Sequence, residues 1–270
     1  MKIGIIGTAF RRNDPLAIPE ELAKVLAPGS EAAVYAPALS AFPHNPFDLK
    51  LQEIGYIEAG LRAAADGCGA IVLNTVGDYG AAALKSAVRV PVAAAGEVGL
   101  HVAASLGRPV GIVTIWPEST RFLYRSVIRE SGLEAAVASV LHVGSESELA
   151  GLGAEDDYIA RMQQADRDVV SRIIAACRKA QRDGAASILL GCTCMSPIAA
   201  EVAAALDIPV VNPLTVVVKY AELMASLGIR QSSACYAAAN PARRPALAAM
   251  AAAGAAIVGA ADCEVCLVGE

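Results

Sequence analysis

The stretch Ile188-Leu-Leu-Gly-Cys-Thr-Cys-Met-Ser-Pro197 decides the fold of this chain, because it combines three structural signals. Its first three side chains form an apolar run that is too short for a helix and typical of a strand buried on both faces. Ser196 is a good helix N-cap, and Pro197 suits the first helical position, where its missing N–H costs nothing. The stretch therefore predicts a buried strand, a tight turn that carries Cys192, and the start of a helix.

The thiol of Cys192 has competing interpretations. In a strand-to-helix turn it would lie near the positive end of the helix dipole, which favours thiolate, the reactive form of cysteine. Alternatively, it is one more small buried hydrophobic side chain. The spacings Cys192-x-Cys194 and Cys263-x-x-Cys266 would also suit a metal site or a redox pair. Without histidines at ligand spacing, we expect no metal.

An internal repeat raises the importance of Cys192. The segment from Asp183 to Cys192 aligns without a gap on the segment from Asp66 to Thr75, at a constant offset of 117 residues. Downstream, Ile208-Pro-Val210 repeats Val90-Pro-Val92. Two similar strand–helix–strand units predict two half-domains related by a pseudo-twofold axis. Equivalent turns would then face each other across a cleft, with Cys192 opposite Thr75.

The composition excludes several classes of protein. The chain has 270 residues and a formal net charge of −5, and no basic stripe with interleaved aromatic residues, so we expect no nucleic-acid partner. Seven cysteines, an odd number in a chain too large to need stapling, indicate a reducing cytosol. The apolar start at residues 2–7 is too short for a signal peptide, and we expect a cytoplasmic protein without a membrane partner. Gly4-x-x-Gly7 lacks the third glycine of a dinucleotide fingerprint, so no NAD or other cofactor is expected.

Strand and helix patterns alternate along the chain, which predicts an α/β fold of parallel sheets flanked by helices. We expect a first α/β half-domain over residues 1–116, a second over 117–230, and a C-terminal extension of unknown role over 231–270, part of which could pack on the first half. Strands are expected at residues 2–7, 31–36, 70–73, 92–94, 110–114, 137–143, 188–190 and 209–211. Helices are expected at 15–27, 51–65, 80–87, around 101, at 117–131, up to about 182, at 213–227 and after 241, with 144–157 as a loop.

Polar residues follow several of the expected strands. They are Thr8, Thr75, Thr114, Cys192 and Asn212. In parallel α/β sheets, ligands bind at the carboxyl ends of the strands. This edge is therefore the expected active site.

Three motifs resemble a known family. They are Gly69-Ala-Ile-Val-Leu-Asn-Thr-Val-Gly-Asp-Tyr-Gly80, Val90-Pro-Val-Ala-Ala-Ala-Gly-Glu97 and Leu190-Gly-Cys-Thr193. Their order and spacing resemble the Asp/Glu/hydantoin racemase superfamily, closest to its hydantoin racemase branch, over roughly residues 1–230. The resemblance implies two pseudo-symmetric Rossmann-like half-domains with the active site in the cleft between them. It also implies cofactor-independent chemistry, a small carboxylate or hydantoin-like substrate, and a homo-oligomer.

The chain departs from this family at one of its two cysteine positions. Two-cysteine racemases carry a thiol in each half, but Thr75 stands at the first position here. Glutamate racemases also carry a histidine where this chain has Cys194, so glutamate racemase itself is not expected. Two thiols of lowered pKa can remove a proton from one face of a carbon and deliver one to the other. A threonine hydroxyl is a much weaker acid, although it can donate a hydrogen bond to an enolate oxygen.

Three functions remain open. The first is a racemase or epimerase with Cys192 as acid/base and Thr75 or a water opposite. The second is a single-cysteine decarboxylase or cis–trans isomerase of small carboxylates, resembling arylmalonate decarboxylase or maleate isomerase. The third is a non-catalytic protein that binds small acids.

Further residues are candidates for substrate binding, through backbone N–H groups and hydroxyls at the two turns and through neighbouring strand ends. They are Thr8, Asn74, Val76, Gly77, Thr114, Trp116, Thr193 and Cys194. Trp116 also has a plain structural interpretation, as a packed aromatic side chain.

Overall fold

The computed structural model describes residues 1–7, 17–154 and 156–258. The chain divides into two compact units. The first contains the described residues within Met1–Asn74, Asp78–Ala94 and Val217–Glu270, and the second contains Thr75–Gly77 and those within Ala95–Val216. Thr8, Cys263 and Cys266 lie outside the described residues.

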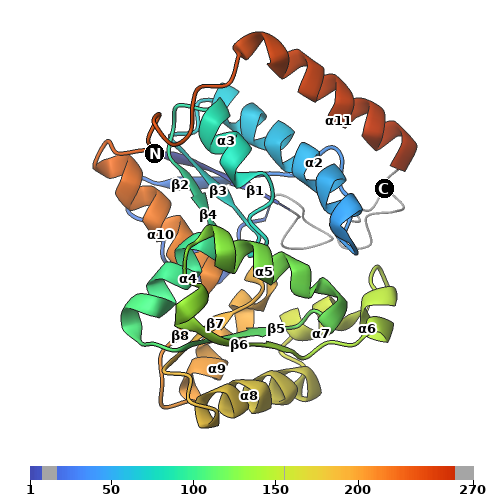
Figure 1. Ribbon diagram of the computed structural model, residues 1–270, viewed down its shortest axis with the longest axis vertical. Coiled ribbons are helices and arrows are strands. Elements are labelled where there is room, and N and C mark those ends of the chain that lie inside the picture. Colours follow the sequence, from blue (N-terminus) through green and yellow to red (C-terminus); the bar gives the residue numbers. More distant parts are fainter. Residues whose placement is uncertain (8–16, 155, 259–270) are drawn as a thin grey trace. The chain divides into compact units, whose positions relative to one another are not determined.

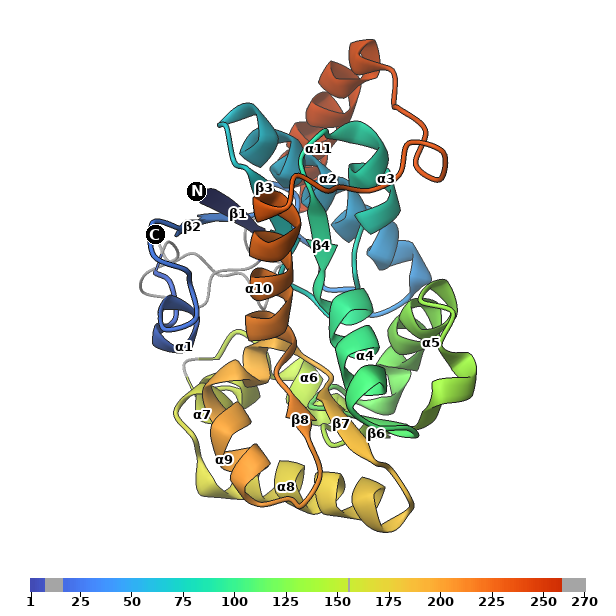
Figure 2. The same cartoon turned by 90° about the vertical axis from the view of Figure 1, so that its left-hand side faces the viewer.

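The first unit is built on a parallel sheet of four described strands. In chain order they are β1 (Lys2–Ile6), β2 (Glu31–Tyr35), β3 (Ala70–Leu73) and β4 (Val92–Ala94), and their order in the sheet is β2-β1-β3-β4. The helices of this unit are α1 (Glu20–Ala23), α2 (Pro46–Ala65), α3 (Ala81–Ala87), most of α10 (Pro213–Ser226) and α11 (Arg244–Val258). Figure 2 shows α10 on the opposite side of this sheet from α2 and α3, and α11 packs on α2.

The second unit repeats this arrangement. Its parallel strands are β5 (Val110–Thr114), β6 (Val137–His142), β7 (Ser187–Leu190) and β8 (Val210–Val211), and their order is β6-β5-β7-β8. Its helices are α4 (Ala95–Leu106), α5 (Arg121–Glu130), α6 (Glu146–Ala150), α7 (Tyr158–Gln163), α8 (Arg167–Arg182) and α9 (Ala199–Ala204). Figure 1 shows α4 and α5 on one face of the sheet and α8 and α9 on the other.

The fold class expected from the sequence is confirmed: both units are α/β with parallel sheets. β3 and β7 occupy the same place in the two sheet orders. The residues of β3 and β7 are also separated by the 117-residue offset of the sequence repeat. All four residues of each strand are buried, as the apolar runs predict.

The second sheet begins earlier in the chain than the expected boundary at residue 116. β5 pairs with β6 and β7 and therefore belongs to the second sheet. In the chain, α4 connects β4 of the first sheet to β5. Chain beyond Val217 contributes to the first unit, where Gln231 donates from its amide to the carbonyl of Val90 at 3.0 Å. Chain order therefore does not follow the boundary between the compact units.

Three local expectations were wrong. α2 begins at Pro46 and not at residue 51, because the Asn45 side chain accepts hydrogen bonds from the first two backbone N–H groups. The expected loop at 144–157 contains α6, which starts with a capping box in which Ser145 and Glu148 bond each other's backbone N–H groups. Of the helix expected at 15–27, the described residues contain only α1.

The start of the helix after β7 also differs from the expectation. Ser196 lies inside a short 3₁₀ helix, Thr193–Ile198, and Cys192 is the residue that caps it. The Cys192 side chain accepts from the backbone N–H of Cys194. A sulfur atom therefore takes the capping role that the sequence assigned to a serine hydroxyl.

Within the described ranges, no helix combines the length and apolar character needed to cross a membrane.

Candidate active site

Thr75 and Cys192 occupy equivalent positions in the repeat. Each lies two residues beyond the end of its strand, β3 or β7. Although β3 belongs to the first unit, Thr75 and the two residues after it belong to the second, as does Cys192. Val76 lies in the same buried cluster as Leu189 of β7. Hydrophobic packing thus brings the turn after β3 and the strand before Cys192 into one unit.

The turn at Cys192 requires a glycine immediately before it. A Cβ atom on Gly191 would lie 2.6 Å from the Cβ of Thr114 and 3.1 Å from the carbonyl oxygen of Val113. The backbone N–H of Gly191 donates to this carbonyl at 2.7 Å. The end of β7 therefore packs directly against the end of β5, which fixes where the chain turns toward Cys192.

Cys192 and Cys194 are joined by a disulfide, with their Cα atoms 5.2 Å apart. The backbone N–H of Cys194 also donates to the sulfur of Cys192 at 3.2 Å. Both cysteines are half-buried and pack against the core formed by β7, α8 and the 3₁₀ helix. In this state Cys192 carries no thiol, so any proton transfer by this residue requires the reduced form.

Tyr124 on α5 holds the same turn from the other side. Its hydroxyl donates to the carbonyl of Gly191 at 2.8 Å and shares a second hydrogen bond with the Thr114 hydroxyl at 2.5 Å. Tyr124 and Thr114 are both buried, and Thr114 has no exposed surface. Thr114 therefore supports the turn and offers no surface to a substrate in this conformation. The sequence analysis did not single out Tyr124, which lies within the helix expected at residues 117–131.

The backbone of Trp116 is anchored next to this pair. Its N–H donates to the Thr114 hydroxyl at 3.2 Å, and its carbonyl lies 3.1 Å from Nδ1 of His142. The His142 ring packs edge-on against the Tyr124 ring, with 5.6 Å between the ring centroids. The half-buried Trp116 side chain packs against both core clusters of the second unit.

The backbone donors expected at the two turns are largely in use. The N–H of Asn74, which belongs to the first unit, donates to Ile6 at 2.8 Å. The N–H of Gly77 donates to the hydroxyl of Thr75 at 3.1 Å, and that of Cys194 to the Cys192 sulfur. Thr193 is buried beside them. Of the expected oxyanion donors, these three N–H groups already have acceptors within the chain.

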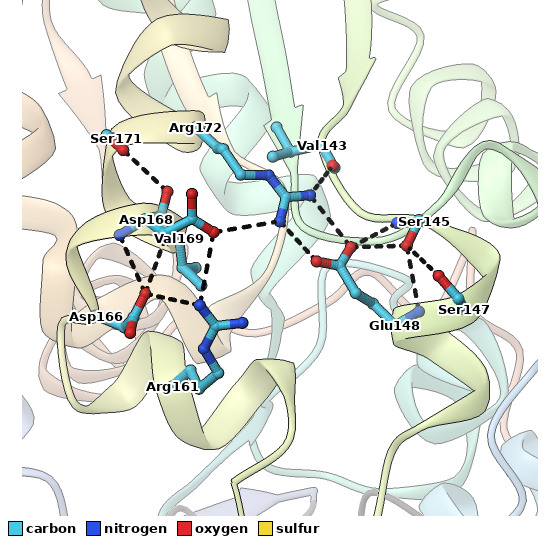
Figure 3. Close-up of polar contacts among 10 residues, drawn as sticks. All are labelled: Val143, Ser145, Ser147, Glu148, Arg161, Asp166, Asp168, Val169, Ser171 and Arg172. Atoms are coloured by element: carbon cyan, nitrogen blue, oxygen red, sulfur yellow. Dashed lines mark hydrogen bonds and ion pairs between the residues drawn. The ribbon is translucent and has the colours of Figure 1, made fainter.

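A charged network joins residues 143–148 and α7 to α8 (Figure 3). Arg172 on α8 bonds both carboxylate oxygens of Glu148, at 2.6 and 3.2 Å, and donates to the carbonyl of Val143 at 2.8 Å. The hydrogen bonds from Arg172 lower the pKa of Glu148, against a smaller opposing effect of burial. The network ties the segment after β6 to α8.

Tyr158 lies between this network and the core. The Arg172 guanidinium sits over its ring at 5.3 Å, and the ring belongs to the buried cluster against which Cys192 packs. In the described part of the chain its buried hydroxyl has no hydrogen-bond partner. Burial raises the pKa of Tyr158 to about 12.

The chain is similar in sequence to a known family of racemases. Residues 17–221 match the family described as Asp/Glu/Hydantoin racemase. A hydantoin racemase from Paenarthrobacter aurescens is 28% identical over 234 residues, which cover 82% of this chain and 92% of that protein. The match spans most of the chain, and the chain belongs to the Asp/Glu/hydantoin racemase family.

Solved structures agree with this fold. The allantoin racemase from Pseudomonas fluorescens has a TM-score of 0.76 at 24% identity, covering 89% of this chain and 98% of that one. An unliganded arylmalonate decarboxylase has a TM-score of 0.53 at 18% identity, covering 84% of this chain and 93% of that one. At these identities the likeness extends to the fold alone.

Proposed function

We propose that this chain is a cofactor-independent racemase of hydantoin-like compounds, in which Cys192 moves a proton at a carbon next to a carbonyl. The observation that carries the proposal is the position of Cys192. It follows β7 at the second-cysteine motif of the family, on a turn held by Gly191 and Tyr124. The similarity to hydantoin racemases supports this choice of substrate class.

The active form is the reduced form, in which Cys192 is a thiol or thiolate. An ordinary cysteine has a pKa of about 8.5, so a modest preference for the thiolate makes it an effective base near neutral pH. In the disulfide form, the N–H of Cys194 donates to the Cys192 sulfur at 3.2 Å. The thiolate removes the proton from one face of the substrate carbon, and the electron pair passes into the adjacent carbonyl as an enolate.

Thr75 supplies a hydrogen-bond donor for that enolate. Its hydroxyl oxygen accepts from the N–H of Gly77, which orients the hydroxyl and leaves its own proton for a substrate oxygen. Thr75, or a water beside it, donates a proton to the opposite face of the enolate. The alkoxide or hydroxide that remains is neutralised through solvent by the proton that Cys192 has taken up, which restores the thiolate. We place the substrate next to Val76 and Trp116 as well, and keep Thr8, Asn74, Thr193 and Cys194 as candidate neighbours of it.

The replacement of the first cysteine by Thr75 favours a second candidate function. With a single thiol, Cys192 would protonate an enolate on one face only, as a decarboxylase requires. In a cis–trans isomerase of small carboxylates, its thiolate would instead add to the double bond as a nucleophile and leave after rotation. A non-catalytic acid-binding protein is the third possibility. We further propose a cytoplasmic homo-oligomer, on the basis of the cysteine usage and the resemblance to the family.

The test is proton exchange in D₂O under excess dithiothreitol. Wild type and Cys192→Ser are incubated with a 5-substituted hydantoin, allantoin, an arylmalonate and maleate, and followed by proton NMR and polarimetry. A racemase exchanges the proton at the chiral carbon while optical rotation decays, and Cys192→Ser abolishes both. Deuterium found only in a decarboxylated or isomerised product supports the second candidate.

Cys235→Ser is the matched control, because Cys235 is an exposed free thiol in the first unit. It should behave as wild type. An exchange that persists in Cys192→Ser would overturn the assignment of the proton to this residue, whatever the substrate.

A further inference from the structure

Cys192 and Cys194 combine two properties in one turn. Cys192 is the residue to which the proposed function assigns proton transfer, and Cys194 is the residue that closes a disulfide with it. We propose that this pair is a reversible redox switch, in which the dithiol is the active state and the disulfide the inactive state. This inference rests on the proposed function, because only a reaction that needs the Cys192 thiol is switched off by its loss.

The disulfide contributes little as a structural staple. In the chain-entropy model, the stabilisation by a disulfide grows with the loop it closes, and here only Thr193 separates the two cysteines. The strands, helices and buried core around the turn form without the aid of a longer cross-link. Opening this bond therefore leaves the fold in place, as a switch requires.

The other described cysteines lack these properties. Cys68 and Cys177 are buried and free, and Cys235 is exposed and free. Burial raises the pKa of Cys177 to about 12, which keeps it a protonated, unreactive thiol. Among the described cysteines, only Cys192 and Cys194 have a partner within disulfide distance.

The geometry suits a bond that both forms and opens. The Cα separation of 5.2 Å lies within the usual range for disulfides, so the turn accommodates the closed bond. Both cysteines are half-buried, which leaves the sulfurs within reach of a small thiol or peroxide. In large intracellular proteins, disulfides are mostly transient and serve catalysis or redox sensing.

Oxidation and reduction of the pair each proceed in two steps. In oxidation, the Cys192 thiolate attacks a peroxide and becomes a sulfenic acid, releasing hydroxide or an alkoxide, which takes a proton from water. The Cys194 thiol then displaces the sulfenic oxygen as water and forms the disulfide. In reduction, a small thiol attacks the disulfide to form a mixed disulfide, and a second thiol releases it. Two thiol molecules are thereby oxidised to one disulfide, and Cys192 and Cys194 each regain a proton.

The covalent change can be read on one peptide. Trypsin cuts after Arg182 and after Lys219, and the peptide between them contains Cys192 and Cys194 and no other cysteine. The folded wild type is equilibrated in glutathione buffers, trapped with iodoacetamide and digested. The expected result is a peptide that takes up two alkyl groups in reducing buffer and none in oxidising buffer, with racemase activity lost and regained in parallel.

The stoichiometry of glutathione separates an internal disulfide from a glutathione adduct. An internal disulfide releases two glutathione molecules, so diluting the total glutathione at a fixed ratio shifts the balance toward the disulfide. A mixed disulfide depends on the ratio alone. Wild type and the control Cys235→Ser should lose activity on dilution. Cys194→Ala should not, when its activity is expressed relative to its own value in excess dithiothreitol.

The outcomes separate the switch from the enzyme. Equal activity of both peptide states overturns the switch and removes Cys192 from the reaction. A peptide that stays oxidised in the folded protein under excess dithiothreitol also overturns the switch. The peptide can also change between its dithiol and disulfide forms in a protein that is inactive toward every hydantoin tested. This result overturns the proposed substrate, while the peptide measurement still shows that the two cysteines form a reversible redox pair.

Discussion

Two buried tyrosine hydroxyls in the second unit differ in their hydrogen bonding. The hydroxyl of Tyr124 bonds both the Gly191 carbonyl and the Thr114 hydroxyl, whereas in the described residues that of Tyr158 bonds nothing. Removing a buried hydroxyl that is fully bonded leaves its partners unsatisfied, and removing one that is unbonded relieves a desolvation penalty. The same substitution, tyrosine to phenylalanine, should therefore act in opposite directions at the two sites.

Tyr124→Phe should impair catalysis because it allows Cys192 to shift from its position. The variant leaves the Gly191 carbonyl without its donor, so the turn that carries Cys192 is less well held. We expect kcat to fall by about tenfold with a small change in KM, as for a displaced catalytic group. Tyr220→Phe, at an exposed site on α10, is the control. A variant with wild-type kcat, or with a raised KM at unchanged kcat, would reduce Tyr124 to a structural residue.

Tyr158→Phe should stabilise the protein. Loss of the unpartnered hydroxyl raises the unfolding free energy at pH 7 by about 1 kcal/mol. The pKa of Tyr158 is about 12 in the folded state, against about 10 when unfolded. The folded state binds the tyrosine proton more tightly, so this titration leaves the wild-type unfolding free energy unchanged below about pH 10 and lowers it as pH rises toward 12. Urea denaturation at pH 7 and above pH 10 should show the wild type losing stability faster than the variant. A less stable variant with an unchanged pH slope would contradict this.

Two glycines on α2 show how an element is fixed by what it touches. A Cβ on Gly55 would lie 1.8 Å from the carbonyl oxygen of Leu39, which is backbone and cannot turn away. A Cβ on Gly60 would lie 2.5 Å from the end of the Leu84 side chain, which can change rotamer. The helix therefore approaches the segment after β2 as closely as its backbone allows.

These contacts predict different effects for one substitution. Gly55→Ala should destabilise the protein by about 3 kcal/mol, at the upper end for overpacking. Gly60→Ala should be milder, because Leu84 can adjust and alanine gains about 1 kcal/mol of helix propensity. Chemical denaturation of the two variants side by side tests this difference. Equal losses would mean that the segment after β2 is free to move.

The charged network of Figure 3 joins α6 to α8. Its central pair, Arg172 and Glu148, is partly buried and bonded at two points, and Glu148 also accepts from the backbone N–H of Ser145. Bidentate arginine–carboxylate pairs combine energy with geometric specificity. The pair therefore holds the capping box of α6 against α8.

Glu148→Gln should destabilise the protein at pH 7 by about 1 kcal/mol, within the range for a partly exposed pair. The pKa of Glu148 is lower in the folded state, so its contribution is complete above the ordinary glutamate pKa and is lost as pH falls through the lowered value. The variant should thus differ from wild type at pH 7 and converge with it at low pH. Glu134→Gln, at an exposed site, should be neutral at both. A constant difference at all pH values would assign the effect to packing.

At the scale of the whole chain, the repeat sets up paired positions with unlike residues. Thr75 and Cys192 follow equivalent strands, and both belong to the second compact unit. This chain therefore combines one cysteine with one threonine at the paired positions.

Thr75→Cys should restore the second acid/base. In excess dithiothreitol we expect racemisation, followed by polarimetry, to accelerate by about 10²-fold, the lower end of the range for a positioned general base. Thr75→Ser keeps the hydroxyl and should match wild type. If the cysteine variant gains nothing while the serine variant is unchanged, Thr75 does not lie opposite Cys192.

The sequence by itself determined the α/β fold class, most of the strands and helices, the repeat, the family and the place of Cys192 after a buried strand. These features are encoded in runs of neighbouring residues and in the similarity between two segments that lie 117 residues apart. The tertiary structure alone decided that Tyr124 bonds Gly191, that Thr75–Gly77 belongs with the second unit, and that Cys192 pairs with Cys194. Hydrogen bonds between distant residues exist only once the core has formed. Whether two cysteines with one residue between them can form a disulfide depends on the backbone of the turn. The contact of β7 with β5 sets that backbone, and the local sequence does not.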